Sequence, residues 1–158
     1  MTIAARLSQY LNDQSVDYHL IQHPHTRTSR ESAHSAHVRE DQVAKAILLR
    51  DKEGFVMVVI PASSSLDLRA VHMETGRNSL EMVAENELGS IFPDCELGAL
   101  PPVGQAYGIT TLLDSGLSRC ETIFFEAGDH EELVEMNGPQ FNKLFAGCRS
   151  ADLSKDWP

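Results

Sequence analysis

One lysine interrupts an apolar row of the sequence and is the strongest candidate for chemistry. Residues 43–50 have the composition of a strand, in which successive side chains point to opposite faces. Lys45 then shares a face with three apolar residues, Val43, Ile47 and Leu49. An ammonium group among such neighbours is costly unless it meets a partner or opens into a pocket, and burial lowers its pKa. The pattern indicates a functional lysine in a pocket. A strand-edge lysine whose head group reaches solvent is the alternative.

Histidine and aspartate residues provide further candidates. His130 lies in Gly128–Glu131, an expected turn between two strands, where an imidazole can orient water or hydrogen-bond a substrate amine. A surface turn residue is the alternative. Asp114 follows an expected strand, where it either shapes a pocket or forms a turn. His34 and His37 share a face of an expected helix, but no third metal ligand is evident in the sequence, which favours a solvated pair.

The elements that must position these residues alternate between helices and strands. Periodicity and capping predict helices over residues 2–13, 28–37, 65–74, 85–91 and 139–145, and strands over 16–23, 43–50, 55–60, 79–83, 109–113, 121–126 and 133–136. The clearest features are the hairpin over 43–60 and a capping box over 28–31. Residues 98–104 cannot be regular, because two prolines remove amide donors, and are expected to form a functional loop.

Composition limits the class of protein. The chain has 158 residues, of which 42% are hydrophobic, enough for one compact domain. Its longest apolar runs, 46–49 and 55–60, are far shorter than the roughly 20 residues that span a bilayer. The N-terminus lacks the pattern of a secretory signal, which predicts a cytoplasmic protein without membrane contact. Three widely spaced cysteines, Cys95, Cys120 and Cys148, are typical of reduced structural thiols.

The net charge of −10 argues against broad binding to a nucleic-acid backbone, since that affinity comes largely from cations that meet phosphates. We expect no DNA partner. An enzyme that holds only the charged terminal adenosine of a tRNA is compatible with this acidity, provided that some cations line its entrance. The candidates are Arg27, Arg30, Lys45, Arg69 and Arg77.

Seven short segments carry a resemblance to a known family. They are His23–Thr26, Ser29–Ala33, Val43–Lys45, Val58–Pro61, Gly98–Gly104, Asp114 and Ala127–Glu131. In this order and spacing the chain resembles, over nearly its whole length, the YbaK/prolyl-tRNA-synthetase-associated domains, which are bacterial insertion-type trans-editing aminoacyl-tRNA deacylases. The resemblance implies an α+β fold with a mixed, curved β-sheet flanked by helices. We expect one domain over residues 1–148 and a loose C-terminal tail over 149–158.

The resemblance also assigns site residues. It implies that Lys45 is tied to deacylation and that His130 contributes to the site. We expect Lys45 to hold the substrate carbonyl or the terminal phosphate, while amides of the 98–104 loop complete an anion site. The expected substrate-binding residues are Gly98, Ala99, Pro101, Pro102, Gly104, Arg30, Ala46, Asp114 and Gly128.

The expected activity is hydrolysis of mischarged aminoacyl-tRNA in trans, at the ester of the tRNA 3′ end, without a metal or an organic cofactor. A weak association with a synthetase is compatible with the resemblance.

Ala46 argues against alanine as the edited residue, since alanine-specific members of the family carry asparagine directly after the lysine. Val103 stands where many relatives carry phenylalanine. Two alternatives remain: a non-catalytic module that binds an amino acid or aminoacyl ligand, and a hydrolase of another small ester.

Overall fold

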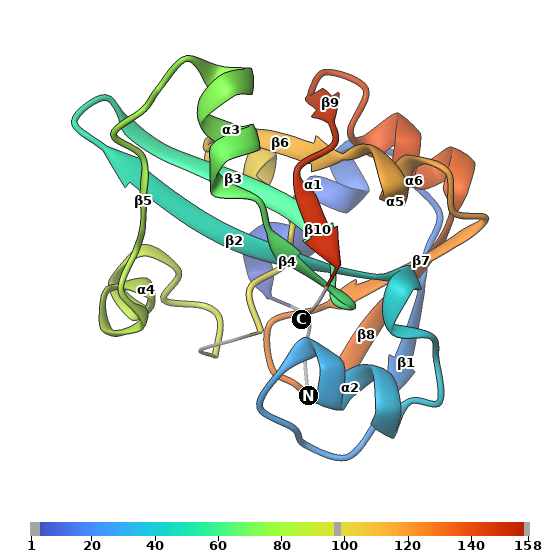
Figure 1. Ribbon diagram of the computed structural model, residues 1–158. Helices are drawn as coiled ribbons and strands as arrows, with labels where there is room; N and C mark the ends of the chain where they lie inside the picture. Colours follow the sequence, from blue (N-terminus) through green and yellow to red (C-terminus); the bar gives the residue numbers. More distant parts are fainter. Residues whose placement is uncertain (1–3, 97–98, 157–158) are drawn as a thin grey trace.

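The protein is described by a computed structural model over residues 4–96 and 99–156. Helices are interspersed with strands along these ranges (Figure 1). In chain order they are α1 (Ala5–Asp13), β1 (His19–Gln22), α2 (Ser29–Ser35), the 3₁₀ turn η1 (Glu40–Gln42), β2 (Val43–Asp51), β3 (Gly54–Pro61), β4 (Ser64–Leu66), α3 (Leu68–Thr75), β5 (Glu81–Met82), α4 (Glu85–Ile91), the 3₁₀ turn η2 (Gly104–Tyr107), β6 (Thr110–Asp114), α5 (Ser115–Ser118), β7 (Thr122–Glu126), β8 (Glu132–Asn137), α6 (Gly138–Leu144), β9 (Arg149–Ala151) and β10 (Ser154–Asp156). Within the described ranges, no helix is long and apolar enough to cross a membrane.

A mixed sheet of eight strands forms the centre of the described structure. Its order is β1-β8-β7-β2-β3-β6-β9, and β5 pairs with β2. The β2–β3 hairpin is antiparallel, whereas β2 pairs with β7, β3 with β6 and β6 with β9 in parallel. Figure 1 shows this hairpin as the long diagonal through the molecule. The mixed sheet flanked by helices that the sequence predicted is confirmed.

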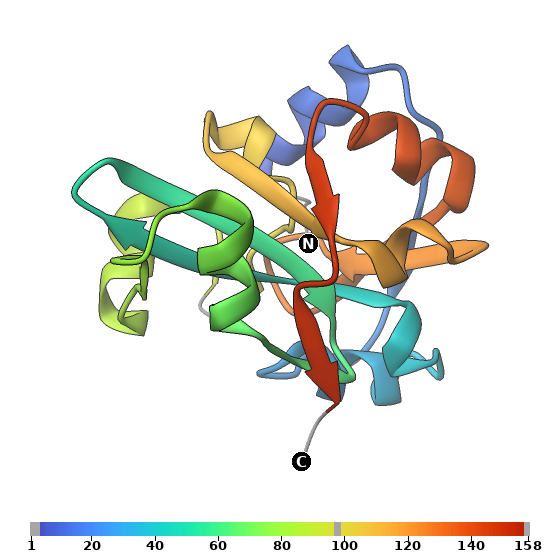
Figure 2. The same ribbon diagram turned by 45° about the horizontal axis from the view of Figure 1, so that its top comes forward.

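Alternating side chains give the hairpin two buried faces. On one face, Leu48 packs in a cluster that includes Leu7 of α1 and Phe141 of α6. On the other face, Leu49 belongs to a cluster that includes Val71 of α3. Figure 2 shows α1 and α6 next to each other, away from α3. Because both faces of β2 are covered, its register is strongly specified, since a slip of one residue would exchange the two faces.

Short-range interactions explain two local features, the start of α2 and the turn of the β2–β3 hairpin. The capping box predicted at residues 28–31 is confirmed: the Glu31 N–H donates to the Thr28 hydroxyl at 3.1 Å, and the Arg27 N–H donates to the Glu31 carboxylate at 3.0 Å. These bonds satisfy amides at the start of α2 and stabilise its first turn. In the hairpin, Gly54 has φ of 126°, a conformation that favours glycine.

Two predictions about the chain were wrong. Instead of a helix that begins near Ser65, residues 64–66 form β4, and α3 begins after Asp67, whose carboxylate accepts the Ala70 N–H. The segment expected to be a loose tail is ordered over 149–156, because β9 pairs with β6 and β10 pairs with β4. Leu153, between these two strands, is fully buried.

Candidate functional site

Lys45 lines a cavity of about 430 Å³ on the edge of β2. The start of α2 contributes polar and cationic residues to its wall, and β5, α4 and the loop before η2 contribute apolar ones. The lining residues are Arg27, Thr28, Ser29, Arg30, Lys45, Ala46, Ile47, Leu48, Met82, Val83, Leu88 and Leu100. A largely apolar cavity with a few convergent polar groups is the usual form of a small-ligand site.

Lys45 combines a half-buried position with a perturbed pKa. Its register partner on β3 is Ile60, and its side chain interrupts the apolar row that the sequence predicted. Burial is the main cause that lowers the pKa of Lys45 from its usual value, and the nearby Arg30 guanidinium lowers it further, while Glu40 opposes the shift. A lysine that is perturbed by burial and by a specific charge, and that lies in a cavity, is a candidate functional group.

Arg30 reaches the same cavity from α2 and is held by an acidic partner. Its Nε donates to the Glu40 carboxylate, and the bond from Arg30 lowers the pKa of Glu40 below its usual value. The Nε2 atom of His34 lies 3.6 Å from the other oxygen of Glu40. Glu40 therefore fixes Arg30 at the cavity wall. With Arg27 and Lys45, three of the five cations proposed from the sequence line one cavity.

The structure places His130 in a buried turn, apart from the residues that line the Lys45 cavity. It is 2% exposed, and its φ of 58° is unusual for a residue other than glycine. Its Nδ1 lies 3.5 Å from the Glu126 carboxylate, and its ring contacts the His25 ring edge to face at 6.0 Å. Asp129 accepts the N–H groups of Glu131 and Glu132 and closes this turn. These contacts determine the shape of the β7–β8 turn.

The proline-glycine loop contacts the cavity through one described residue. Leu100 lines it, whereas Ala99, Pro101, Pro102 and Gly104 are buried and do not. A Cβ at Gly104 would lie 2.2 Å from the Thr111 hydroxyl, so this glycine permits close packing of the loop on β6. Gly98 lies outside the described residues.

The remaining expected substrate-binding residues divide between the cavity and the rest of the fold. Arg30 and Ala46 line the cavity. Asp114 is 5% exposed, caps α5 through the Gly116 N–H, and accepts the N–H of Leu153 at 2.8 Å. Gly128 has φ of 119°, and a Cβ there would lie 2.9 Å from the Ala4 side chain. Asp114 and Gly128 thus hold the C-terminal and N-terminal segments on the domain.

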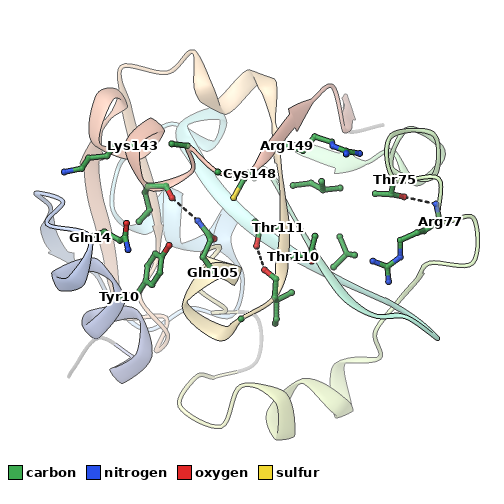
Figure 3. Close-up of a pocket in the computed structure, with 17 residues that line it drawn as sticks. Tyr10, Gln14, Thr75, Arg77, Gln105, Thr110, Thr111, Lys143, Cys148 and Arg149 are labelled. Carbon is green, nitrogen blue, oxygen red and sulfur yellow. Dashed lines mark hydrogen bonds between the residues drawn. The ribbon is translucent and has the colours of Figure 1, made fainter.

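A second cavity is larger, about 840 Å³, and lies beside β6 (Figure 3). Figure 3 shows Lys143 at one end and Arg77 at the other, so its cations do not converge. Arg77 donates to the Asp51 carboxylate, and Arg149 donates to the Glu74 carbonyl at 2.6 Å. We assign function to the smaller cavity, because it gathers its cations opposite an apolar wall around a lysine with a lowered pKa.

Metal and thiol chemistry receive no support from the described residues. Over 4–96 and 99–156, no group of three or more His, Cys, Asp or Glu side chains is arranged to hold a metal ion. The three cysteines are free and half-buried. Burial raises the pKa of the Cys95 thiol to about 12, and also raises the pKa values of Cys120 and Cys148, so these thiols stay protonated at neutral pH.

Sequence reasoning missed the apolar wall of the cavity. Met82 comes from β5, Val83 directly follows this strand, Leu88 comes from α4 and Leu100 from the loop after α4. A signal was available: between Arg77 and Glu96 polar and charged residues are frequent, yet Met82, Val83 and Leu88 recur among them. Met82 is 63% exposed, which is unusual for a large apolar side chain and marks the cavity mouth.

Comparison with known proteins gives a family and a fold. Residues 23–144 match the family model of the aminoacyl-tRNA editing domain. A curated relative, the proline–tRNA ligase of Thermosipho melanesiensis, is 26% identical over 98 residues, which are 62% of this chain and only 17% of the ligase.

Two crystal structures, one of the hypothetical protein APE2540 and one of "a putative trans-editing enzyme for prolyl tRNA synthetase", share the fold. The first has a TM-score of 0.83 and 22% identity, and the match covers 95% of this chain and 99% of that structure. The second has a TM-score of 0.82 and 21% identity, and the match covers 96% of this chain and 96% of that structure. The resemblance inferred from the sequence is confirmed. Because the family model matches most of its length, the chain belongs to the aminoacyl-tRNA editing domain family.

Proposed function

We propose that this protein hydrolyses the ester that joins a wrongly attached amino acid to the 3′ end of a tRNA, in the cavity that contains Lys45. The observation that carries this proposal is the convergence of three cations, Arg27, Arg30 and Lys45, on one side of a cavity whose other side is apolar. An aminoacylated adenosine has matching parts, since it carries a phosphate, an ester carbonyl and a side chain. Membership of the editing-domain family supports the same substrate class.

The proposed chemistry needs one water molecule and no covalent intermediate. The water oxygen attacks the ester carbonyl carbon, negative charge develops on the carbonyl oxygen, and the bond to the ribose oxygen then breaks. The ribose oxygen takes up one proton of the attacking water, the other is released to solvent, and the products are the free amino acid, as its carboxylate, and the tRNA hydroxyl. In this scheme the Lys45 ammonium stabilises the oxyanion, while Arg27 and Arg30 hold the terminal phosphate.

The acidity of the chain is compatible with this substrate if contact is confined to the acceptor end. A net charge of −10 disfavours a long phosphate track. Two or three phosphate contacts at the cavity would give a salt dependence of only about −1.4 to −2.1 in log K against log salt, from roughly −0.7 for each single-strand phosphate. Steeper dependence would indicate a wider tRNA-binding surface than the one proposed.

The decisive test is a panel of tRNAs charged with different amino acids, incubated with the wild-type protein and with Lys45→Ala. We expect loss of the aminoacyl group from at least one mischarged tRNA, with correctly charged tRNA as the control, and we expect the variant to fold normally and lose this activity. Undiminished deacylation by folded Lys45→Ala would remove Lys45 from the mechanism. Tight binding of aminoacyl-tRNA without hydrolysis by the wild type would instead show a non-catalytic module.

A further inference from the structure

The cavity lies along a gap in the pairing of β2. Among the described strands, β2 pairs with β7 only at residues 43–44 and with β5 only at residues 49–50. Figure 1 shows β7 and β5 at opposite ends of β2. The four residues between these contacts, 45–48, all line the cavity. Because consecutive side chains alternate in direction, a cavity that touches all four lies against the edge of the strand, where peptide groups are presented.

Hydrogen-bond directions identify the peptide groups that face this gap. The Ala62 N–H donates to the Val43 C=O at 2.7 Å, on the β3 side of β2. In an antiparallel ladder every second residue bonds to the same neighbour, so the odd-numbered residues of β2 direct their peptide groups towards β3. On the opposite side, the Val83 N–H donates to the Leu48 C=O at 3.0 Å. The same alternation directs the N–H and the C=O of Ala46 towards the cavity.

An aminoacyl group presents the groups that Ala46 can pair with. It carries an amine donor and a carbonyl acceptor on either side of one α-carbon, as does a residue in a strand. We propose that the aminoacyl group of the substrate pairs with Ala46 like one residue of an added antiparallel strand. Its amine donates to the Ala46 C=O, and its carbonyl oxygen accepts from the Ala46 N–H. This inference rests on the proposed function and deepens it by naming what the site recognises.

The charge of the cavity supports this orientation of the substrate. A substrate ammonium group is repelled by Arg27, Arg30 and Lys45, and therefore needs an acceptor away from them; the Ala46 carbonyl supplies one. The substrate carbonyl oxygen accepts from the N–H of Ala46, the residue that follows Lys45 in the chain. Developing negative charge would meet an amide and an ammonium together, which is the arrangement of an oxyanion site.

Strand pairing also fixes where the substrate side chain points. Directly opposite residues of an antiparallel pair place their side chains on the same face, so an L-amino acid paired with Ala46 directs its side chain to the Ala46 face. That face contains the apolar residues Val83, Leu88 and Leu100. The site therefore selects L-amino acids with apolar side chains, and a D-amino acid would point to the opposite face, which carries Ile47.

Amide hydrogen exchange tests the pairing directly. The probe is 3′-deoxy-3′-(L-valylamino)adenosine, whose amide resists hydrolysis, and the matched control is its 3′-(3-methylbutanoylamino) analogue, which lacks only the α-amine. In the free protein the Ala46 amide should exchange faster than those of Lys45 and Ile47, which bond to β3. The probe should slow exchange at Ala46 about tenfold or more, and the control should protect Ala46 less, because it lacks the amine that donates to the Ala46 C=O.

Each outcome of this experiment bears on the pairing. Binding of the probe with unchanged exchange at Ala46 would overturn the proposed pairing while deacylation could still stand. Equal protection by the control without the amine would overturn the pairing as well. Absence of binding at millimolar probe would overturn the pairing as well. Protection at Ala46 in a protein that deacylates no tRNA would support the pairing and overturn the proposed hydrolysis.

Substitution of Ala46 provides a second readout that leaves its peptide groups in place. Ala46→Val narrows the space on the face where the substrate side chain lies. We expect the ratio of kcat/KM for the largest accepted side chain to that for the smallest to fall about tenfold. Ile47→Val, which changes the cavity wall on the opposite face, should alter this ratio less. Equal effects of the two variants would contradict the assigned direction of the side chain.

Discussion

Replacing Lys45 by methionine should separate activity from stability, because the charge assigned to the reaction is unfavourable for folding. The pKa of Lys45 is lowered, since burial and repulsion from Arg30 outweigh attraction to Glu40. A lysine with a lowered pKa binds its proton less tightly in the folded state than in the unfolded chain. Methionine keeps most of the side-chain volume and removes the charge. The free energy of unfolding should therefore stay unchanged or rise.

The effect on deacylation should be opposite and large. Removal of one donor that stabilises an oxyanion typically lowers kcat by about 10²–10³, or about 2.7–4 kcal/mol. Arg27 and Arg30 remain in the Lys45→Met protein and should preserve substrate binding, so that KM changes less than kcat. The assay is loss of a labelled aminoacyl group in single turnover, paired with urea unfolding monitored by fluorescence. Lys52→Met, at the exposed hairpin turn, is the matched control.

Two results would refute this reasoning. A stable Lys45→Met protein that deacylates within threefold of wild type would show that the ammonium does not stabilise the transition state. A variant that loses activity and stability in proportion would show that Lys45 holds the fold. Only a loss of kcat without a loss of unfolding free energy agrees with a charge retained for function at the expense of stability.

Four further predictions follow from the same contacts. Since the pKa of Lys45 lies below 10.5, deacylation corrected for uncatalysed hydrolysis should decline at an alkaline pH below 10.5, and Lys45→Arg should move this decline upward if it retains activity. The pKa of Asp51 is lowered to about 2 by its guanidinium partner, so its stabilising contribution is present above about pH 4 and lost as the pH falls towards 2; urea unfolding should show Asp51→Asn less stable than wild type at pH 7, with the difference shrinking at pH 2. Gly104→Ala places a Cβ 2.2 Å from the Thr111 hydroxyl and should cost about 1–3 kcal/mol of unfolding free energy, less when Thr111→Ala is added; equal costs in both backgrounds would contradict the assigned clash. Leu153→Ala should cost about 2–5 kcal/mol, whereas a negligible change in thermal midpoint would mean that the C-terminal strands contribute little.

The elements with strong local signals could be predicted from the sequence. Strand β2 was expected over 43–50 and extends to Asp51, and α4 was expected over the residues that form it. Each has a run of seven or more residues whose pattern can be read alone. The capping box at the start of α2 could also be predicted, because its two hydrogen bonds join residues only three or four apart in the sequence. Where the cause of structure is local, the sequence shows it.

The C-terminal strands could not be predicted, because they form by pairing with strands that lie far away in the sequence. β9 and β10 have three residues each, too few to show a period, and they pair with strands far earlier in the chain. Asp114 connects the two regions, since its carboxylate accepts the Leu153 N–H and the Ser154 hydroxyl. An aspartate after a strand suggested a turn or a pocket residue, and nothing near it in the sequence indicated a partner almost forty residues later.

The candidate site divides in the same way. Lys45 could be found because it is a charged residue in an otherwise apolar row of a strand. Such departures from the local pattern are typical of functional positions. The apolar wall required knowledge of tertiary packing, because Met82, Leu88 and Leu100 are ordinary residues until α4 and its flanking segments fold against β2. Their recurrence among polar residues marks them as apolar positions, but it does not distinguish the wall of a cavity from the core.

The gap in the ladder explains why a cavity forms beside Lys45. β7 follows β2 for only two residue pairs before it turns back through Gly128, whose positive φ permits the reversal. β5 has only two residues, so it covers only the other end of the same edge. Lengthening either strand would pair the peptide groups of Ala46 and close the site. The short pairings on this side of β2 are therefore a condition for binding. They cost some sheet stability, but they leave the N–H and C=O of Ala46 available to hydrogen-bond a substrate.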